Sequence, residues 1–276
     1  MTDQAAVVET PEVTGSMHER PQRSHQKRRR FYIGAGVFSI LLAFAGFGPS
    51  LIDHSRRFAP PSGLYVAHGA TNLAWLALFL AQATLVARGR VAVHRRLGWA
   101  GPVIAATVIG LGVAIVIDGA FRQSDLSGDV ARLVLRPGAP PFTEAESIAG
   151  IWGPLGVLLN FSILVAAGLL FRHRPEIHKR LMVFSLVPLG IESLLHLSGV
   201  LVGRVPVAQG VLRGFWLTSS FLLLLVVPIH DKLSKGRIHP ASVWIPLLFV
   251  AWTVLSNAVI FRSAPAFKLA SWILQR

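Results

Sequence analysis

Seven long apolar segments dominate this sequence and limit what it can fold into. They lie at about 31–53, 63–87, 99–120, 149–171, 181–202, 211–230 and 241–261. A block of roughly twenty apolar residues is what the ~30 Å hydrocarbon core of a bilayer requires of a helix. Only 14% of the residues are charged, whereas a soluble domain carries about a quarter. The sequence therefore predicts an all-α polytopic membrane bundle of about seven transmembrane helices.

The segments outside these blocks suggest three regions. Residues 1–30 are polar, end in "HQKRRR" and are expected to be a disordered basic cytoplasmic tail. Residues 31–262 form the transmembrane domain, and residues 263–276 form a short amphipathic segment or an extension of the last helix. The stretches "RRRF" and "AFA" are also found in cleaved signals. The long preceding tail and the six later spans favour retention of the first helix.

The basic residues predict the orientation of the chain. The net charge is +14, which in a soluble protein would suggest nucleic acid. Here 17 of the 27 Lys and Arg residues lie in the first 30 residues or in the turns at 88–96, 172–180 and 232–237. Such residues mark cytoplasmic loops. We therefore expect a bacterial inner-membrane protein with a cytoplasmic N-terminus and a periplasmic C-terminus, in contact with membrane lipids and with no nucleic-acid partner.

Two of these turns carry the same phrase. Residues 88–97 are "RGRVAVHRRL" and residues 172–181 are "RHRPEIHKRL", which align without a gap as R-x-R-x-x-x-H-x-R-L. A weaker echo, "HDKLSKGRIHP", joins the last two apolar blocks. Anchoring in the cytoplasmic leaflet explains the basic residues, but it does not explain the recurrent histidine. We expect the two phrases to form equivalent hairpins, with His94 and His178 at equal depth.

Several polar residues fall inside the apolar segments, where burial in lipid costs free energy unless the side chains face the bundle interior. At a rise of 1.5 Å per residue, His68 and His196 lie roughly 7 and 9 Å from the outer surface. Asn72, Asn160 and Glu192 lie deeper. We expect these five side chains to form one polar site that opens outward, with the second and fifth helices in contact.

The four histidines then form two pairs, His68 with His196 and His94 with His178. Two facing imidazoles are the usual axial ligands of a b-type haem, and a carboxylate or amide behind a ligand fixes its tautomer. Haem is therefore a candidate cofactor, with iron held between helices two and five by His68 and His196, and Asn72, Asn160 and Glu192 behind the ligands. The inner pair is a candidate for a second haem. A zinc site of His68, Glu192 and His196 is a further alternative.

The phrases "VHRRLGW", "HKRLM" and "GRIHPA" resemble those of a group of bacterial multi-pass inner-membrane proteins without an established activity. The resemblance covers most of residues 31–245 and implies the same architecture. The chain also resembles, more weakly, the cytochrome b561-type proteins, whose four-helix core holds two haems through paired histidines. That likeness implies ligands at His68, His94, His178 and His196. In this sequence the two inner histidines lie in or beside basic turns rather than well inside helices.

Other chemistry is disfavoured. The chain has no cysteine, which excludes disulfides, thiolate catalysis and cysteine-bound metals. It contains no Walker phosphate-binding motif and no nucleophile motif, so we do not predict an enzyme. Three functions stay open: electron transfer by haem to a redox partner or quinone, a proton-coupled carrier or ion pathway using Glu192 and His196, and a structural or partner-binding scaffold.

Overall fold

The computed structural model describes residues 19–52, 62–122, 144–202, 209–260 and 262–274. In these ranges the chain is helical. The helices are α1 (Glu19–Ile52), α2 (Gly63–Ala87), α3 (Val91–Leu97), α4 (Ala100–Arg122), α6 (Glu144–Leu170), α7 (Pro175–Phe184), α8 (Leu186–Val202), α9 (Gln209–Lys235), α10 (Pro240–Leu255), the π-helical turn η2 (Ser256–Ile260) and α11 (Ala264–Leu274). The predicted all-α membrane bundle is confirmed.

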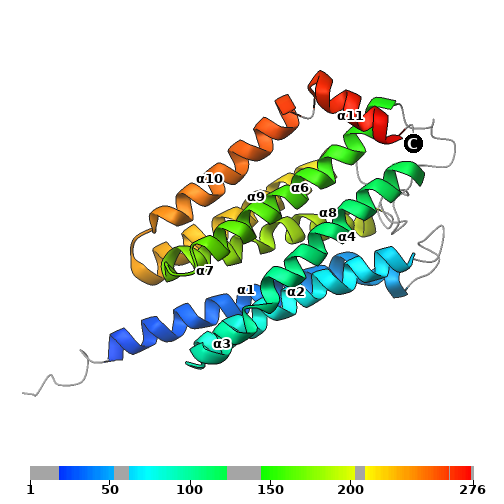
Figure 1. Ribbon diagram of the computed structural model, residues 1–276. Helices are drawn as coiled ribbons and strands as arrows, with labels where there is room; N and C mark the ends of the chain where they lie inside the picture. The colour runs from blue at the N-terminus through cyan, green and yellow to red at the C-terminus, as the bar shows by residue number, and fades with distance from the viewer. Residues whose placement is uncertain (1–18, 53–61, 123–143, 203–208, 261, 275–276) are drawn as a thin grey trace, which may run out of the picture.

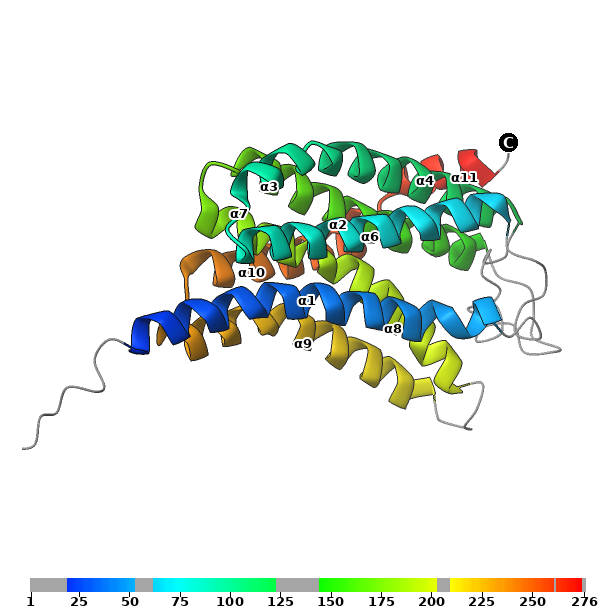
Figure 2. The same ribbon diagram turned by 90° about the horizontal axis from the view of Figure 1, so that it is seen from below.

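Six helical stretches are long and apolar enough to cross a membrane: Arg30–Pro49, Gly63–Ala87, Val91–Gly119, Ile151–Leu170, Pro175–Ser198 and Pro240–Ile260. This number refers only to the described residues. The remaining expected span, 211–230, lies within α9, which runs for 27 residues alongside the others (Figure 2). The side chains of residues 209–217 lie outside the described part of the chain.

Local signals at the helix ends explain several boundaries. The Ser62 side chain accepts a hydrogen bond from the backbone N–H of Tyr65 (3.2 Å) and caps α2, as serine does at many helix starts. At α10, Pro240 occupies the first turn, where its missing N–H has no intrahelical partner to lose. The last helix, α11, lies within the segment 263–276, which was expected to be a short amphipathic segment or an extension of the last transmembrane helix.

Two features of the chain were not predicted. The helix α1 begins at Glu19, so its first residues belong to the segment expected to be a tail, while residues 1–18 lie outside the described residues. The fifth span is divided at Ser185 into α7 and α8. Pro188 follows this break, and proline has no N–H to donate to the carbonyl four residues earlier, which favours an interruption here.

The helices pack in a sequence that places α1 against both α2 and α8, α2 against α4, α4 against α6, and α8 against α9. Figures 1 and 2 show the resulting bundle, with the α2–α3, α6–α7 and α9–α10 turns at one end, which we call the basic end. A core shared by α2, α4, α6 and α8 contains Trp75, Leu76, Ala105, Val108, Phe161, Val165 and Leu186. Helices α2 and α8 therefore contribute to one core together with α4 and α6.

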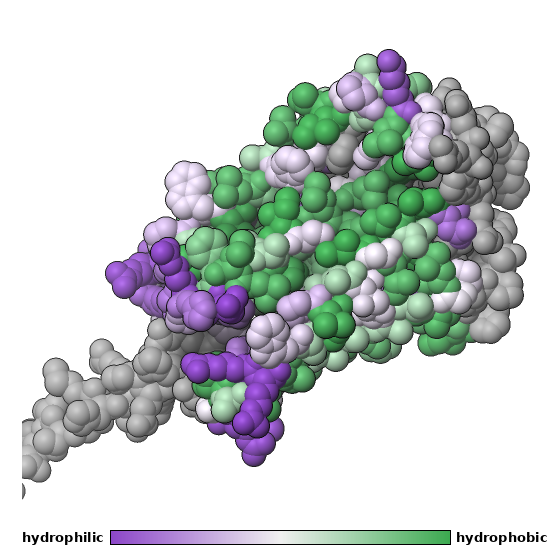
Figure 3. Space-filling model, in the orientation of Figure 1, coloured by the Kyte–Doolittle hydropathy of each residue, from purple (hydrophilic) through white to green (hydrophobic). Residues whose placement is uncertain are grey.

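The outer surface of the bundle is apolar. Large hydrophobic side chains on several helices are exposed, among them Phe44, Val103, Leu170, Leu222 and Leu248. In Figure 3 hydrophobic residues cover most of the flank, while hydrophilic residues gather mainly at the basic end. A large exposed apolar surface is unusual for a soluble monomer, but it is what acyl chains require. The protein is therefore a membrane protein.

Candidate functional site

The two repeated phrases adopt the same local structure. In each, an arginine precedes a short helix, and its carbonyl accepts a hydrogen bond from the histidine four residues later. The backbone N–H of His94 donates to Arg90 (3.0 Å), and that of His178 donates to Arg174 (2.9 Å). Arg90 and Arg174 are the N-caps of α3 and α7. The two phrases are thus structural counterparts, and each places its histidine at the end of the first helical turn.

The bundle brings these two histidines together. The ring centroids of His94 and His178 are 6.5 Å apart, and their planes cross at 78°. The depths of the two rings therefore differ by no more than 6.5 Å, and the prediction of equal depth is confirmed to within this distance. The sequence alone predicted equal depth; the structure adds that the two rings are also lateral neighbours.

A backbone carbonyl fixes the orientation of the His178 ring. Its Nδ1 lies 2.7 Å from the carbonyl oxygen of Gly168. A carbonyl only accepts hydrogen bonds, so Nδ1 carries the proton and donates. In the neutral ring, Nε2 then has a lone pair available. This arrangement, with one ring nitrogen tied to a carbonyl, is the one that metal-binding histidines adopt.

The surroundings of His94 also contain polar atoms without partners. Within the described residues, Nδ1 of His94 and Oε1 of Gln82 are buried and make no hydrogen bond. Gly98 packs closely here, since a Cβ at this position would lie 3.1 Å from the His94 carbonyl oxygen and 3.7 Å from Nε2 of Gln82. Nδ1 of His68 is likewise buried without a partner, so such atoms occur beside the inner and the outer histidines alike.

The outer histidines have other neighbours. Nδ2 of Asn72 donates to Nε2 of His68 (2.9 Å) and to the His68 carbonyl (2.9 Å) within α2. The His68 ring lies beside Gly112 of α4, where an added Cβ would be 3.6 Å from its Cε1 atom. In this arrangement Nε2 of His68 accepts a hydrogen bond from Asn72 rather than presenting a free lone pair.

On the fifth span, His196 is buried, and its ring packs against Phe47 of α1, with centroids 4.2 Å apart. Close packing of α1 on α8 makes this contact possible, because a Cβ at Gly46 would lie only 2.4 Å from the Ser193 carbonyl oxygen. Glu192 lies half-buried one turn before His196.

Asn160, the fifth member of the expected outer site, contacts a residue of another helix. Nδ2 of Asn160 donates to Oγ1 of Thr253 (3.3 Å), which joins α6 to α10. These contacts tie the expected outer-site residues to α4, α1 and α10, and none of them joins His68 to His196. The outer pair stays a prediction.

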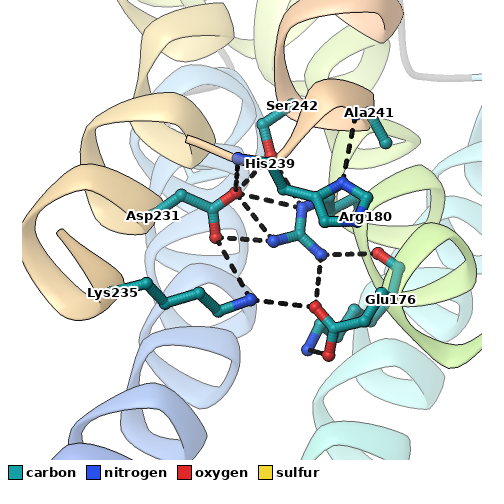
Figure 4. A network of polar contacts seen from close by, with 8 residues as sticks. Glu176, Arg180, Asp231, Lys235, His239, Ala241 and Ser242 are labelled. Carbon is teal, nitrogen blue, oxygen red and sulfur yellow. Dashed lines mark hydrogen bonds and ion pairs between the residues drawn. The ribbon is translucent and has the colours of Figure 1, made fainter. Parts of the chain in front are cut away.

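A buried ionic network at the basic end was missed by the sequence analysis. Arg180 is fully buried, and Asp231 is 2% exposed. Nε of Arg180 donates to Oδ2 of Asp231 (3.1 Å), and Nη2 donates to Oδ1 (2.6 Å) and Oδ2 (2.7 Å). Ser242 accepts from Nε of Arg180 (2.7 Å) and donates to Asp231. Figure 4 shows how this cluster joins α7, α9 and the start of α10.

The network continues to the surface. Nη1 of Arg180 donates to Oε2 of Glu176 (2.8 Å), which also accepts from Lys235 (2.9 Å), while Lys179 contacts Oε1 of the same carboxylate. The His239 backbone N–H donates to Asp231 (3.3 Å). Removing one member of a buried ion pair is costly, so this network fixes the relative positions of three helices. One feature of the sequence could have indicated this network: Asp231, in "HDK", is an acidic residue within a basic turn.

The two phrases therefore share their histidine but differ in the role of the last arginine of the pattern. Arg96 is exposed, whereas its counterpart Arg180 is buried against Asp231. The paired histidines are the candidate functional site, and the ionic network beside them is its structural support. Comparisons of this chain with protein-family models, with curated proteins and with solved structures find no match.

Proposed function

We propose that this chain is a b-type haem protein of the bacterial inner membrane that transfers electrons, in which His94 and His178 would hold one haem at the basic end. The observation that carries the proposal is the approach of the two imidazole rings from α3 and α7. The outer pair, His68 and His196, is the alternative position for the iron.

The two rings are close enough that one group could be held by both. The centroids of His94 and His178 are 6.5 Å apart. The hydrogen bond from Nδ1 of His178 to the Gly168 carbonyl leaves Nε2 as the nitrogen for iron.

The donor set favours haem over a metal ion bound by side chains alone. Among the described residues, no group of three or more His, Cys, Asp or Glu side chains is arranged to hold a metal ion. A structural or catalytic zinc site needs about three protein ligands. Haem iron needs only two, because the porphyrin supplies the other four nitrogens.

Haem bound here would supply one-electron redox chemistry. The chain itself would fix the two ligand rings through the α3 and α7 helices, and the Arg180–Asp231 ion pair would hold α7 in place. Electrons would pass between this site and a redox partner or quinone. The positive-inside bias supports a cytoplasmic location for the basic end, with a cytoplasmic N-terminus.

Difference spectroscopy tests the proposal. The full chain is expressed in cells supplied with a haem precursor and purified in detergent, and its reduced-minus-oxidised spectrum is recorded. We expect a Soret band and a sharp α-band. His94→Ala and His178→Ala should each abolish them, while far-UV circular dichroism stays that of the wild type.

His68→Ala and His196→Ala are matched controls, because each removes one imidazole from the same bundle. They should retain the spectrum. A colourless wild-type protein would refute haem binding. Loss of the bands in the outer variants, with retention in the inner ones, would move the iron to the pair that the sequence analysis favoured.

A further inference from the structure

We propose that the two basic turns together form a binding surface for anionic phospholipid headgroups. The surface consists of six exposed arginines on α3 and in the two turns: Arg88, Arg90, Arg95, Arg96, Arg172 and Arg174. This inference does not depend on haem binding.

The contact between the two histidines brings these arginines to one surface. Arg95 and Arg96 directly follow His94, and Arg174 is the residue whose carbonyl accepts from the His178 N–H. Because the two histidine rings are 6.5 Å apart, the guanidinium groups of both turns lie at one end of the bundle. Guanidinium groups recognise phosphate by donating paired hydrogen bonds to it.

The carboxylates at this end are engaged elsewhere. Asp231 is bound by Arg180, and Glu176 contacts Arg180, Lys179 and Lys235. Among the described residues, no ion pair involves any of the six arginines of the surface. Arg172 donates to the Leu169 carbonyl (3.4 Å), and Arg174 lies over the Phe171 ring (5.8 Å). Their positive charge is thus available to a ligand.

Apolar neighbours favour a lipid over an acidic soluble protein. Trp99 is 78% exposed and Leu170 is 77% exposed, and both lie within a few residues of the arginines. Phe171 is exposed as well. Tryptophan beside arginine, above a band of exposed aliphatic residues, is typical of the membrane–water interface. A phospholipid matches this surface with its phosphate against the arginines and its acyl chains against the apolar side chains.

Native mass spectrometry of the full chain tests this proposal. Purified protein is titrated with phosphatidylglycerol or with phosphatidylcholine, and the bound lipids are counted. We expect preferential retention of phosphatidylglycerol. A basic residue near an anionic surface contributes about fivefold to affinity at low salt, so Arg95→Gln/Arg96→Gln should weaken phosphatidylglycerol binding by up to about 25-fold.

Lys232→Gln/Arg237→Gln is the matched control. It removes the same charge from exposed residues of the α9–α10 region, outside the proposed surface, and it should leave the preference nearly unchanged. Equal losses in both double variants would overturn the proposal and indicate a general charge effect. Equal binding of the two lipids by the wild type would also overturn it and would favour an acidic protein as the partner of these arginines.

Discussion

The buried Arg180–Asp231 pair makes a sharp prediction about stability. Asp231→Asn keeps the size of the side chain but removes its charge, so the Arg180 guanidinium would stay buried without its main partner. In the wild type, Nε and Nη2 of Arg180 both donate to this carboxylate, at distances of 2.6–3.1 Å. The side chains of Arg180 and Asp231 are only 0% and 2% exposed, so water cannot solvate the guanidinium after the carboxylate charge is removed.

The expected magnitude follows from these contacts. Breaking a buried ion pair by removing one partner costs about 3–5 kcal/mol. Asparagine retains one oxygen that accepts from Arg180, and Glu176 still lies 2.8 Å from Nη1. We therefore expect the free energy of unfolding to fall by about 3 kcal/mol, the lower end of this range. For a chain of this size, that loss lowers the melting temperature by roughly 6–12 °C.

Thermal unfolding in a mild detergent measures this effect. Glu176→Gln is the control, because the Glu176 side chain is 48% exposed and such surface pairs contribute only about 0–1 kcal/mol. The double variant Arg180→Met/Asp231→Leu should recover most of the stability lost in Asp231→Asn, since an apolar pair needs no charge compensation. A melting temperature for Asp231→Asn within about 2 °C of the wild type, which corresponds to less than ~1 kcal/mol, would refute the role assigned to this pair.

Three further predictions concern pH, packing and topology. Burial, reinforced by Arg180, lowers the pKa of the His239 imidazole, whose Nδ1 caps α10. The unfolded chain therefore binds more protons than the folded one, so the contribution of His239 to stability is fully present above pH ~6.5 and falls below it. The melting temperature of His239→Asn should fall less than that of the wild type between pH 7.5 and 5.5. An equal fall in the two proteins would contradict this. Gly46→Ala should destabilise the fold, because the added Cβ would meet the Ser193 carbonyl, whereas Gly48→Ala has open space around it and should not. Equal melting temperatures for these two variants would count against the α1–α8 packing. A phosphatase fusion at Gly89 should be inactive, and an active one would reverse the proposed orientation.

Much of the architecture could be predicted from the sequence because membrane helices are specified locally. The expected segment 63–87 has the same bounds as α2, since its length, apolar composition and Ser62 cap all lie in one stretch of chain. The equivalence of the two hairpins could also be predicted, because identical spacing of arginine and histidine produces identical first turns.

Contacts between distant segments could not be predicted in the same way. Arg96 and Arg180 occupy the same position of the repeated phrase, yet only Arg180 is buried. Its partner Asp231 lies 51 residues further along the chain, and no feature of the phrase indicates it. Likewise, the shared depth of His68 and His196 gives no information about lateral position. The placement of α1 against both α2 and α8 gives the outer part of α8 a neighbour that periodicity alone does not identify.

Haem stoichiometry tests the central claim most directly. The pyridine haemochrome assay on purified wild-type protein, combined with a protein determination, gives the number of haems per chain. One b-type haem per chain is expected, and the double variant His94→Ala/His178→Ala should contain none, while His68→Ala/His196→Ala keeps one. A wild-type protein without haem, or an inner double variant with unchanged haem content, would contradict the assignment of His94 and His178 as ligands.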